Sequence, residues 1–525
     1  MDSKQPSLPR RGRVGVGGGP KLALGDKALS FEQYSAVAES RLQVSLSGGA
    51  RRRMEVHRQS LLRQLASGAA IYGVNTGYGA DSARRLAPET IRTVQRNTIL
   101  SHVVGVGTDV PRRLVRGMLL LKAVVLAKGY SAVRPDLVDL ICGLLNHDIV
   151  PVVPEQGSLA ASGDLVPSGH LAMALIGEGE VIHSGQRVAA ADALRAAGLA
   201  PIELEEKEGL ALVNGTVFTE AYAIEVVISA ERLLKTADLA GAATLQAMKG
   251  HLGAFSERVI AIRPFPGALE VAANFRDLCG DSELLAGSSG RVHDPYCIRC
   301  IPQVHGASRD AFAYVRRAVE TELDSCTDNP LIFEDGTWTS AGNFHAQPIG
   351  LPMDTAAVLV AEIASISQRR TQHLVSPVYD VGLPAKLSRR PDLGSGLFMA
   401  NTTAAALVSE NKTLSFPASV DSMAVDTTED HVSMGSVAAR KALAIIANSA
   451  HVLAIELICA CQALDLQAPL KASPAIRALR DAVRETVAFV ESDRPLSDDV
   501  KSTARRILDG EFVAAVGGVL NAPLR

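Results

Sequence analysis

The strongest constraint on the fold is the long run 435–465, which is apolar on nearly every face of a helix. A helix of this kind must be covered all round, by protein or by lipid. Asn448, His451, Glu456 and Gln462 interrupt the run, which is unusual in a membrane span. The pattern therefore predicts a helix buried inside a helical bundle and no membrane partner.

Helical periodicity dominates the rest of the chain. In 135–146, apolar residues recur at i, i+3, i+4 and i+7 behind Pro135, and an upstream helix is expected to end at Lys128 and Gly129. Further long helical runs are expected at 214–250, 305–325, 354–373 and 397–412. Strand-like stretches are short, at 180–185 and at 330–342, where Glu334-Asp335-Gly336 is typical of a hairpin turn.

These patterns predict a mainly α fold in three parts. Residues 1–26, rich in Gly and Pro and without a secretory apolar core, are expected to be a disordered tail. Residues 27–207 are expected to form a smaller mixed α/β region, and 208–525 the central helical bundle with the C-terminal helices.

Composition favours a small-molecule partner. The 525 residues carry a formal net charge of −3, which gives no electrostatic reason to expect nucleic acid. The seven cysteines are odd in number and scattered, so we expect free thiols in a reducing cytoplasm. Cys297 and Cys300 have C-x-x-C spacing but lack a second pair, so neither a metal nor an external cofactor is expected.

The triplet Ala161-Ser162-Gly163 offers an unusual electrophile. Attack of the Gly163 nitrogen on the Ala161 carbonyl would close a five-membered ring, and loss of water, including the Ser162 hydroxyl, would leave an electron-poor alkene. Glycine presents the least hindered nitrogen and serine supplies the leaving hydroxyl. Taken alone, the triplet is simply a common turn sequence and does not indicate this chemistry. Motifs of zinc proteases, P-loop proteins and G-x-S-x-G hydrolases are absent from the sequence.

The wider stretch VPEQGSLAASGDLVPSGHLAMALIGEGE closely resembles the segment that carries the methylidene-imidazolone (MIO) group in the aromatic amino acid ammonia-lyase and aminomutase family. The resemblance covers roughly residues 27 to 515, and its motifs occur in family order. They include YGVNTGYG, LAKGYSAVRP, EKEGLALVNGT, DPYCIRCIPQVHG, DNPLIF, GNFHAQP, SENKTLSFPASVDS and EDHVSMG.

The resemblance implies a long-helix bundle of the fumarase/aspartase-like type and an MIO group formed from Ala161, Ser162 and Gly163. Tyr72 matches the tyrosine that removes the substrate β-proton. The remaining implied site residues are Asn214 and Tyr296 around the amine, Arg299 for the carboxylate, and Phe344 beside the ring. A homotetramer whose active sites draw on more than one chain is also implied.

Two positions favour histidine as the substrate. By this resemblance, Glu429 occupies the position at which histidine ammonia-lyases carry glutamate, whereas phenylalanine and tyrosine enzymes usually carry glutamine there. A carboxylate can accept a hydrogen bond from an imidazole N–H, but beside a phenyl ring it would be unpaired. Ser101-His102 matches the Ser-His pair of the histidine enzymes, although tyrosine aminomutases can share it. The implied reaction converts L-histidine to trans-urocanate and ammonia.

Several residues depart from the family pattern. His293, Thr428 and Gln347 each replace a residue usual in histidine enzymes near the expected pocket. Ala160 and the pair Ser168-Gly169 are departures around the triplet. Three alternatives therefore stay open: a close analogue or another aromatic amino acid as substrate, 2,3-aminomutase chemistry, and a catalytically silent paralogue that binds a small molecule.

Overall fold

The computed structural model describes residues 21–286, 291–377, 381–421, 423–425 and 428–525. It is mainly helical with a few short strands, which confirms the predicted fold class. The chain divides into two compact units, and each is described by itself. The first comprises 1–221, 322–345 and 423–432, and the second 222–321, 346–422 and 433–525. The predicted region 27–207 lies wholly within the first unit.

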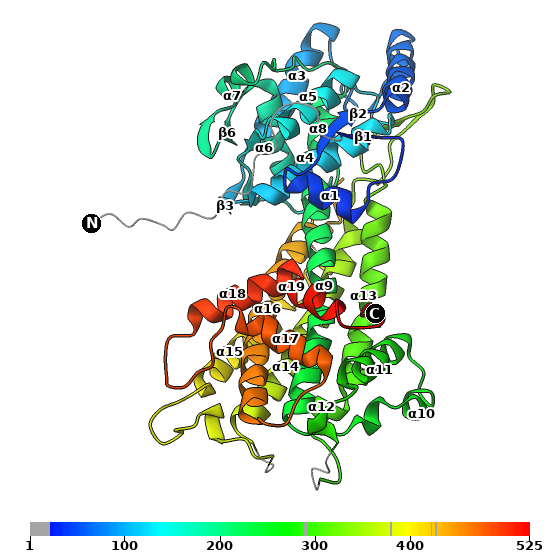
Figure 1. Cartoon of the computed structure of the whole chain (residues 1–525). Coiled ribbons are helices and arrows are strands. Elements are labelled where there is room, and N and C mark those ends of the chain that lie inside the picture. Colours follow the sequence, from blue (N-terminus) through cyan, green and yellow to red (C-terminus); the bar gives the residue numbers. More distant parts are fainter. Residues whose placement is uncertain (1–20, 287–290, 378–380, 422, 426–427) are drawn as a thin grey trace, which may run out of the picture. The chain divides into compact units, whose positions relative to one another are not determined.

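The first unit combines helices with small sheets (Figure 1). Its parallel pair is β1 (Lys21–Leu24) with β2 (Gln43–Leu46), and β3 (Val106–Asp109) runs antiparallel to β5 (Pro154–Gln156). The three-stranded sheet has the order β4 (Val150–Pro151), β6 (Glu180–His183), β7 (Gln186–Ala189). The hairpin of β8 (Leu331–Ile332) and β9 (Trp338–Thr339) contains Gly336 at φ +91°, as the predicted turn requires.

One expectation for the N-terminus is corrected. Residues 21–24 fall inside the predicted disordered tail, yet they form β1. Leu24 is 2% exposed, and β1 pairs along its whole length with β2. Burial of Leu24 and a backbone ladder to a distant strand order this segment, and neither is visible in a Gly/Pro-rich composition. Residues 1–20 of that prediction lie outside the described residues.

The helices of the first unit begin and end near their sequence signals. The helix α5 spans Pro135–Asn146, the predicted bounds, and α4 (Arg112–Ala127) stops before Lys128 and Gly129, whose φ is +93°. The others are α1 (Phe31–Ala38), α2 (Gly48–Ala66), α3 (Ile91–Ser101), α6 (Leu165–Met173), α7 (Ala190–Ala196) and α8 (Glu208–Val213). The boundary between the units falls within α9 (Val217–Ala247).

The second unit is built around α16 (Gly435–Leu466), which packs against α14 (Gln347–Val375), α15 (Phe398–Leu414) and α18 (Ser497–Asp509) (Figure 1). Further helices complete it: α10 (Glu257–Ile260), α11 (Pro266–Cys279), α12 (Tyr296–Arg299), α13 (Ile301–Glu322), α17 (Pro474–Arg484) and α19 (Glu511–Gly517). By length and composition, α14 and α16 could each cross a membrane, but 67% and 72% of their most apolar windows are buried inside the protein. Both are therefore core helices of this unit.

Two of the polar residues that interrupt α16, Glu456 and Gln462, have buried partners. Glu456, fully buried, accepts hydrogen bonds from Arg370 Nε and Nη2 at 2.5 and 2.8 Å, from Ser367 Oγ at 2.6 Å and from Thr244 Oγ1 at 2.8 Å. Gln462 bonds both backbone groups of Val490. These bonds compensate the desolvation of polar groups in an apolar core.

Candidate active site

The triplet 161–163 lies in a tight loop between β5 and α6. Ala160 and Gly163 have φ values of +51° and +81°. Gly163 pairs with Gly215, and the amide of Asp164 donates to the Gly215 carbonyl at 2.7 Å. A Cβ on Gly163 would lie 2.3 Å from that carbonyl oxygen, so only glycine fits at this position.

Asp164 fixes the loop from its C-terminal side. Its fully buried carboxylate accepts from the amide and hydroxyl of Thr219, at 2.7 and 2.9 Å, and from Ser158 Oγ at 3.0 Å. Burial raises the pKa of Asp164, although these hydrogen bonds oppose the shift. The triplet is therefore clamped onto the first turn of α9.

Ser162 and Glu429 are brought together from positions 267 residues apart in the chain. Ser162 Oγ donates to Glu429 Oε1 at 2.8 Å, and both side chains are partly buried. The segment 423–432 belongs to the first unit although most of the surrounding sequence belongs to the second. A carboxylate thus lies directly against the central residue of the triplet.

Tyr72 lies in the loop after α2, next to a second tyrosine. The backbone N–H of Gly79 donates to the Tyr72 hydroxyl oxygen at 3.3 Å, and the rings of Tyr72 and Tyr78 meet edge to face at 6.4 Å. The Tyr78 hydroxyl is 2.9 Å from Thr98 Oγ1 and accepts from Gln95 Nε2 at 3.3 Å. Burial raises the pKa of Tyr78, so this phenol stays protonated at neutral pH.

Asn214 follows α8 and is held by a buried lysine. Lys122 Nζ donates to the carbonyls of Asn214 and Ala211 at 2.6 and 3.1 Å. Burial lowers the pKa of Lys122 to about 8. Asn214 Oδ1 is buried and has no hydrogen-bond partner among the described residues. Such an orphan acceptor one residue before Gly215 is available to a ligand or to a modified triplet.

Ser101 and His102 stand at the end of α3. His102 Nδ1 lies 2.5 Å from the Thr98 carbonyl oxygen, so Nδ1 carries a proton and Nε2 is an acceptor when the ring is neutral. Phe344 is partly buried in the first unit, and its neighbour His345 places Nε2 3.2 Å from His431 Nδ1.

His293, Tyr296 and Arg299 belong to the second unit. The Arg299 guanidinium lies over the Tyr296 ring, 4.7 Å from its centre, and Arg299 Nε is buried without a hydrogen-bond partner among the described residues. Tyr296 is 70% exposed and His293 is also exposed. Asp294, next to His293, is buried, and its Oδ1 lies 2.8 Å from Arg291 Nη2.

The other positions that depart from the family pattern have defined surroundings. Gln347 Nε2 donates to the Ser419 carbonyl at 3.0 Å, and Thr428 is exposed. The seven cysteines are all free thiols, as expected. Among the residues that the structure describes, no group of three or more His, Cys, Asp or Glu side chains is arranged to hold a metal ion.

Sequence reasoning missed a cluster of buried charges behind the triplet. Glu220 is buried, and its pKa is raised well above the ordinary value by burial and by Glu322 and Asp164. Thr216 Oγ1 donates to Glu322 at 2.6 Å. The available signal was a single charge in an apolar run: Lys122 within MLLLKAVVLA, and Glu220 in the first turn of α9.

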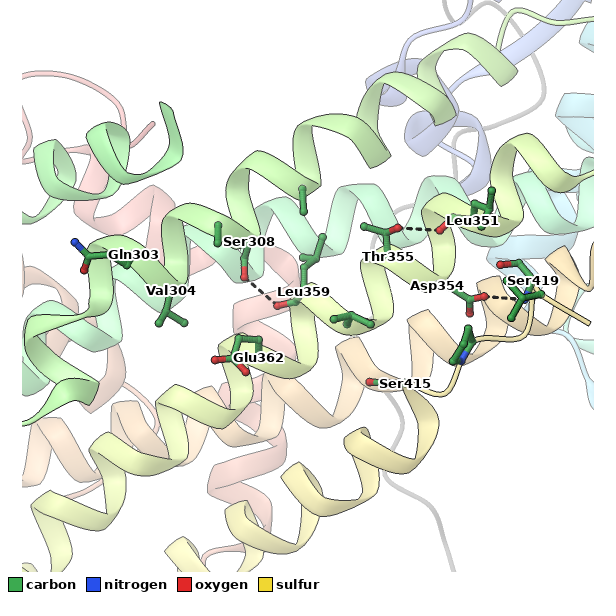
Figure 2. Close-up of a pocket in the computed structure, with 15 residues that line it drawn as sticks. Gln303, Val304, Ser308, Leu351, Asp354, Thr355, Leu359, Glu362, Ser415 and Ser419 are labelled. Carbon is green, nitrogen blue, oxygen red and sulfur yellow. Dashed lines mark hydrogen bonds between the residues drawn. The ribbon is translucent and has the colours of Figure 1, made fainter. Parts of the chain in front are cut away.

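The second unit carries a groove of about 650 Å³ that contains none of the predicted site residues. Figure 2 shows it between α13, α14 and the chain that follows α15. Its exposed apolar side chains include Leu351 and Val358, at 44% and 57% exposure. Asp354 accepts from the Ser419 amide at 2.7 Å at one end.

Comparison with known proteins places this geometry in a family. The aromatic amino acid lyase family model matches residues 29–485. A histidine ammonia-lyase of Myxococcus xanthus is 44% identical over 95% of this chain and 98% of its own length. The structure of a histidine ammonia-lyase from Trypanosoma cruzi superposes with a TM-score of 0.88 at 34% identity, covering 95% of this chain and 96% of that one.

A tyrosine aminomutase from Streptomyces globisporus superposes with a TM-score of 0.91 at 33% identity, over 96% of this chain and all of its own. The family match spans most of the chain and includes the triplet loop and the Glu429 segment. The chain therefore belongs to the aromatic amino acid lyase family.

Proposed function

We propose that the protein eliminates ammonia from L-histidine, or a close analogue, to give trans-urocanate. The observation that carries the proposal is the 2.8 Å hydrogen bond between Ser162 and Glu429, which puts a carboxylate beside the reactive triplet. Curated relatives named histidine ammonia-lyase, 42–45% identical over most of the chain, support the same substrate.

The residues of the loop fit an MIO group formed from Ala161, Ser162 and Gly163. Gly163 cannot carry a side chain, the carboxylate of Asp164 fixes the loop, and Asn214 Oδ1, one residue before Gly215, has no partner within the described part of the chain. When present, this group supplies an electron-poor alkene that accepts an amine and makes ammonia a better leaving group.

Tyr72 is the proposed base for the substrate β-proton. A phenol can act as a base at neutral pH only where its surroundings stabilise the phenolate. The Gly79 N–H already donates to the Tyr72 oxygen and would stabilise the anion more strongly than the phenol. We propose that Arg299 pairs with the substrate carboxylate, because its planar fork suits two oxygens. Asn214 and Tyr296 are proposed at the amine.

Glu429 is the proposed partner of the substrate imidazole. Its carboxylate would accept a hydrogen bond from a ring N–H, whereas a phenyl ring offers no donor to a carboxylate. Ser101, His102, His293 and Phe344 are proposed as further residues around the substrate.

The 2,3-aminomutase reaction is the second candidate, favoured by the likeness to the tyrosine aminomutase. Product retention separates the two reactions. Incubation with L-histidine tests both: urocanate and ammonia identify the lyase, and β-histidine identifies the mutase. If the protein forms neither product from L-histidine and also leaves phenylalanine and tyrosine unchanged, the remaining alternative is a catalytically silent paralogue.

Intact mass tests the prosthetic group independently of the substrate. The polypeptide should be lighter than its sequence by two water molecules, and Ser162→Ala should carry the full mass. A wild-type chain of full mass would contradict the proposal for the triplet.

We also propose a homotetramer in the cytoplasm. The apolar groove along α13 and α14 leaves Leu351 and Val358 exposed, which suits burial against another copy. Free thiols throughout are compatible with a reducing compartment.

A further inference from the structure

The residues after His102 are held by the chain on both sides of the triplet. We call residues 102–109 the His102 segment. Its second half, β3, pairs with β5, with Val106 opposite Gln156 and Asp109 opposite Pro154. Its first half contacts α6, which begins directly after Asp164. The segment and the triplet are therefore parts of one connected structure within the first unit.

A histidine of α6 binds the backbone of this segment. The Gly105 N–H donates to His170 Nε2 at 3.1 Å. His170 must be neutral with its proton on Nδ1 to accept this bond. Burial lowers the pKa of His170, which favours the neutral ring. The bond joins two residues that are 65 positions apart in the chain.

A glycine of α6 allows the backbone of His102 to approach the helix. A Cβ on Gly169 would lie 3.0 Å from His102 Cβ and 3.3 Å from the carbonyl carbon and oxygen of His102. These distances are shorter than ordinary carbon contacts, so any side chain at 169 would displace His102. The His102 ring is itself oriented by the 2.5 Å contact from Nδ1 to the Thr98 carbonyl.

We propose that Gly169 and His170 are positioning residues of the substrate pocket, which act by seating His102 at a set place relative to Ser162. The inference rests on the proposed function, which assigns His102 to the substrate. Because both residues act on a binding group and not on the reacting atoms, they should change KM more than kcat.

The test combines amide hydrogen exchange with steady-state kinetics on the full-length protein. His170→Leu removes the acceptor, whereas His170→Gln can supply an amide oxygen in its place. We expect His170→Leu to speed exchange in residues 103–108 and to raise KM for L-histidine about fivefold, the effect of one ordinary hydrogen bond, with kcat within about twofold. His170→Gln should restore most of both.

Gly169→Ala is the second variant, because it displaces His102 without touching the His170 bond. It should raise KM with little change in exchange at Gly105. Gly253→Ala is the matched control: a Cβ there meets no atom within 4 Å, and KM should stay unchanged.

Wild-type exchange and wild-type KM in His170→Leu would overturn the inference, as would faster exchange with unchanged KM. A wild-type protein that does not consume L-histidine contradicts the proposed function instead. In that case, exchange in residues 103–108 that is faster in His170→Leu and slow again in His170→Gln still supports the positioning role of His170. Equal exchange in wild type, His170→Leu and His170→Gln overturns that role.

Discussion

At the scale of single residues, the proposed substrate rests on the placement of Glu429. In the unmodified chain its hydrogen bond to Ser162 puts one carboxylate oxygen at the triplet. Ring formation would remove the Ser162 hydroxyl, and the Glu429 side chain is only partly buried, so the carboxylate can then meet a ligand. A hydrogen bond to a charged acceptor contributes about 1.5–3 kcal/mol, more than a neutral one.

Replacing Glu429 by glutamine should therefore lower the activity on histidine more than the activity on phenylalanine. We expect Glu429→Gln to lower kcat/KM for L-histidine by roughly tenfold to a hundredfold, while kcat/KM for phenylalanine stays equal or rises. Kinetics with both substrates measure this. Glu491→Gln, on an exposed residue, is the control. Equal losses for both substrates would indicate a role in the chemistry common to them.

Lys122 makes a separate prediction about pH. Its pKa is about 8 in the folded protein and 10.5 in an ordinary setting, so between these values the unfolded chain binds more protons. Stability from this group therefore rises as pH increases from 8 to 10.5, by up to about 3 kcal/mol.

Urea unfolding of wild type and Lys122→Met at pH 7 and pH 10 measures that contribution. Wild type should gain stability relative to the variant at the higher pH. Lys501→Met, at an exposed position, should show no such difference. A constant gap between wild type and Lys122→Met would mean that Lys122 titrates normally.

The sequence pointed to the triplet but not to the residues that hold its surroundings in place. Ala161-Ser162-Gly163 and Glu429 could be singled out in the linear sequence because the stretches around them resemble family motifs, whereas the triplet alone is a common turn. Lys122 and Gly169 contact residues far along the chain, and a lysine in an apolar helix or a glycine beside a histidine has no distinctive pattern of its own.

At the scale of elements, the sequence predicted the long helices and the strands β6, β8 and β9, but it missed other short strands such as β1. Pro135 and the apolar spacing behind it were enough to place α5. The strand β1 has four residues and exists because β2 supplies a parallel partner, so its local sequence carries no strong signal. The all-round apolar surface of α16 predicted its burial, but not which helices would cover it.

The buried ion pair between α14 and α16 should be a major support of the second unit. Removing one partner leaves the other charge buried, which typically costs about 3–5 kcal/mol. We expect Arg370→Met to lower the free energy of unfolding by that amount in denaturant titration. Arg389→Met, whose pair with Glu491 is exposed, should change it by less than about 1 kcal/mol. A near-neutral Arg370→Met would show that the ion pair does not support the second unit.

At the scale of the whole molecule, the sequence predicted a division near residue 207 but not the return of later segments. Residues 322–345 and 423–432 rejoin the first unit and bring Phe344 and Glu429 with them. Linear order cannot show this, because the segments are short and lie between helices of the second unit.

Assembly is tested on the groove of the second unit. We expect light scattering to give the mass of a tetramer, and Val358→Asp to reduce it, because a charge would be buried in an apolar contact. Val259→Asp, at a similarly exposed position on α10, is the control. A monomeric wild-type protein would contradict the assignment of this groove to a contact between subunits.

The most direct measurement of the central claim is the product balance from L-histidine. We predict that the wild-type protein forms urocanate and ammonia in equal amounts, and that Ser162→Ala forms neither at a rate within about a thousandfold of wild type. Equal activity of wild type and Ser162→Ala, or consumption of histidine without urocanate, would contradict it.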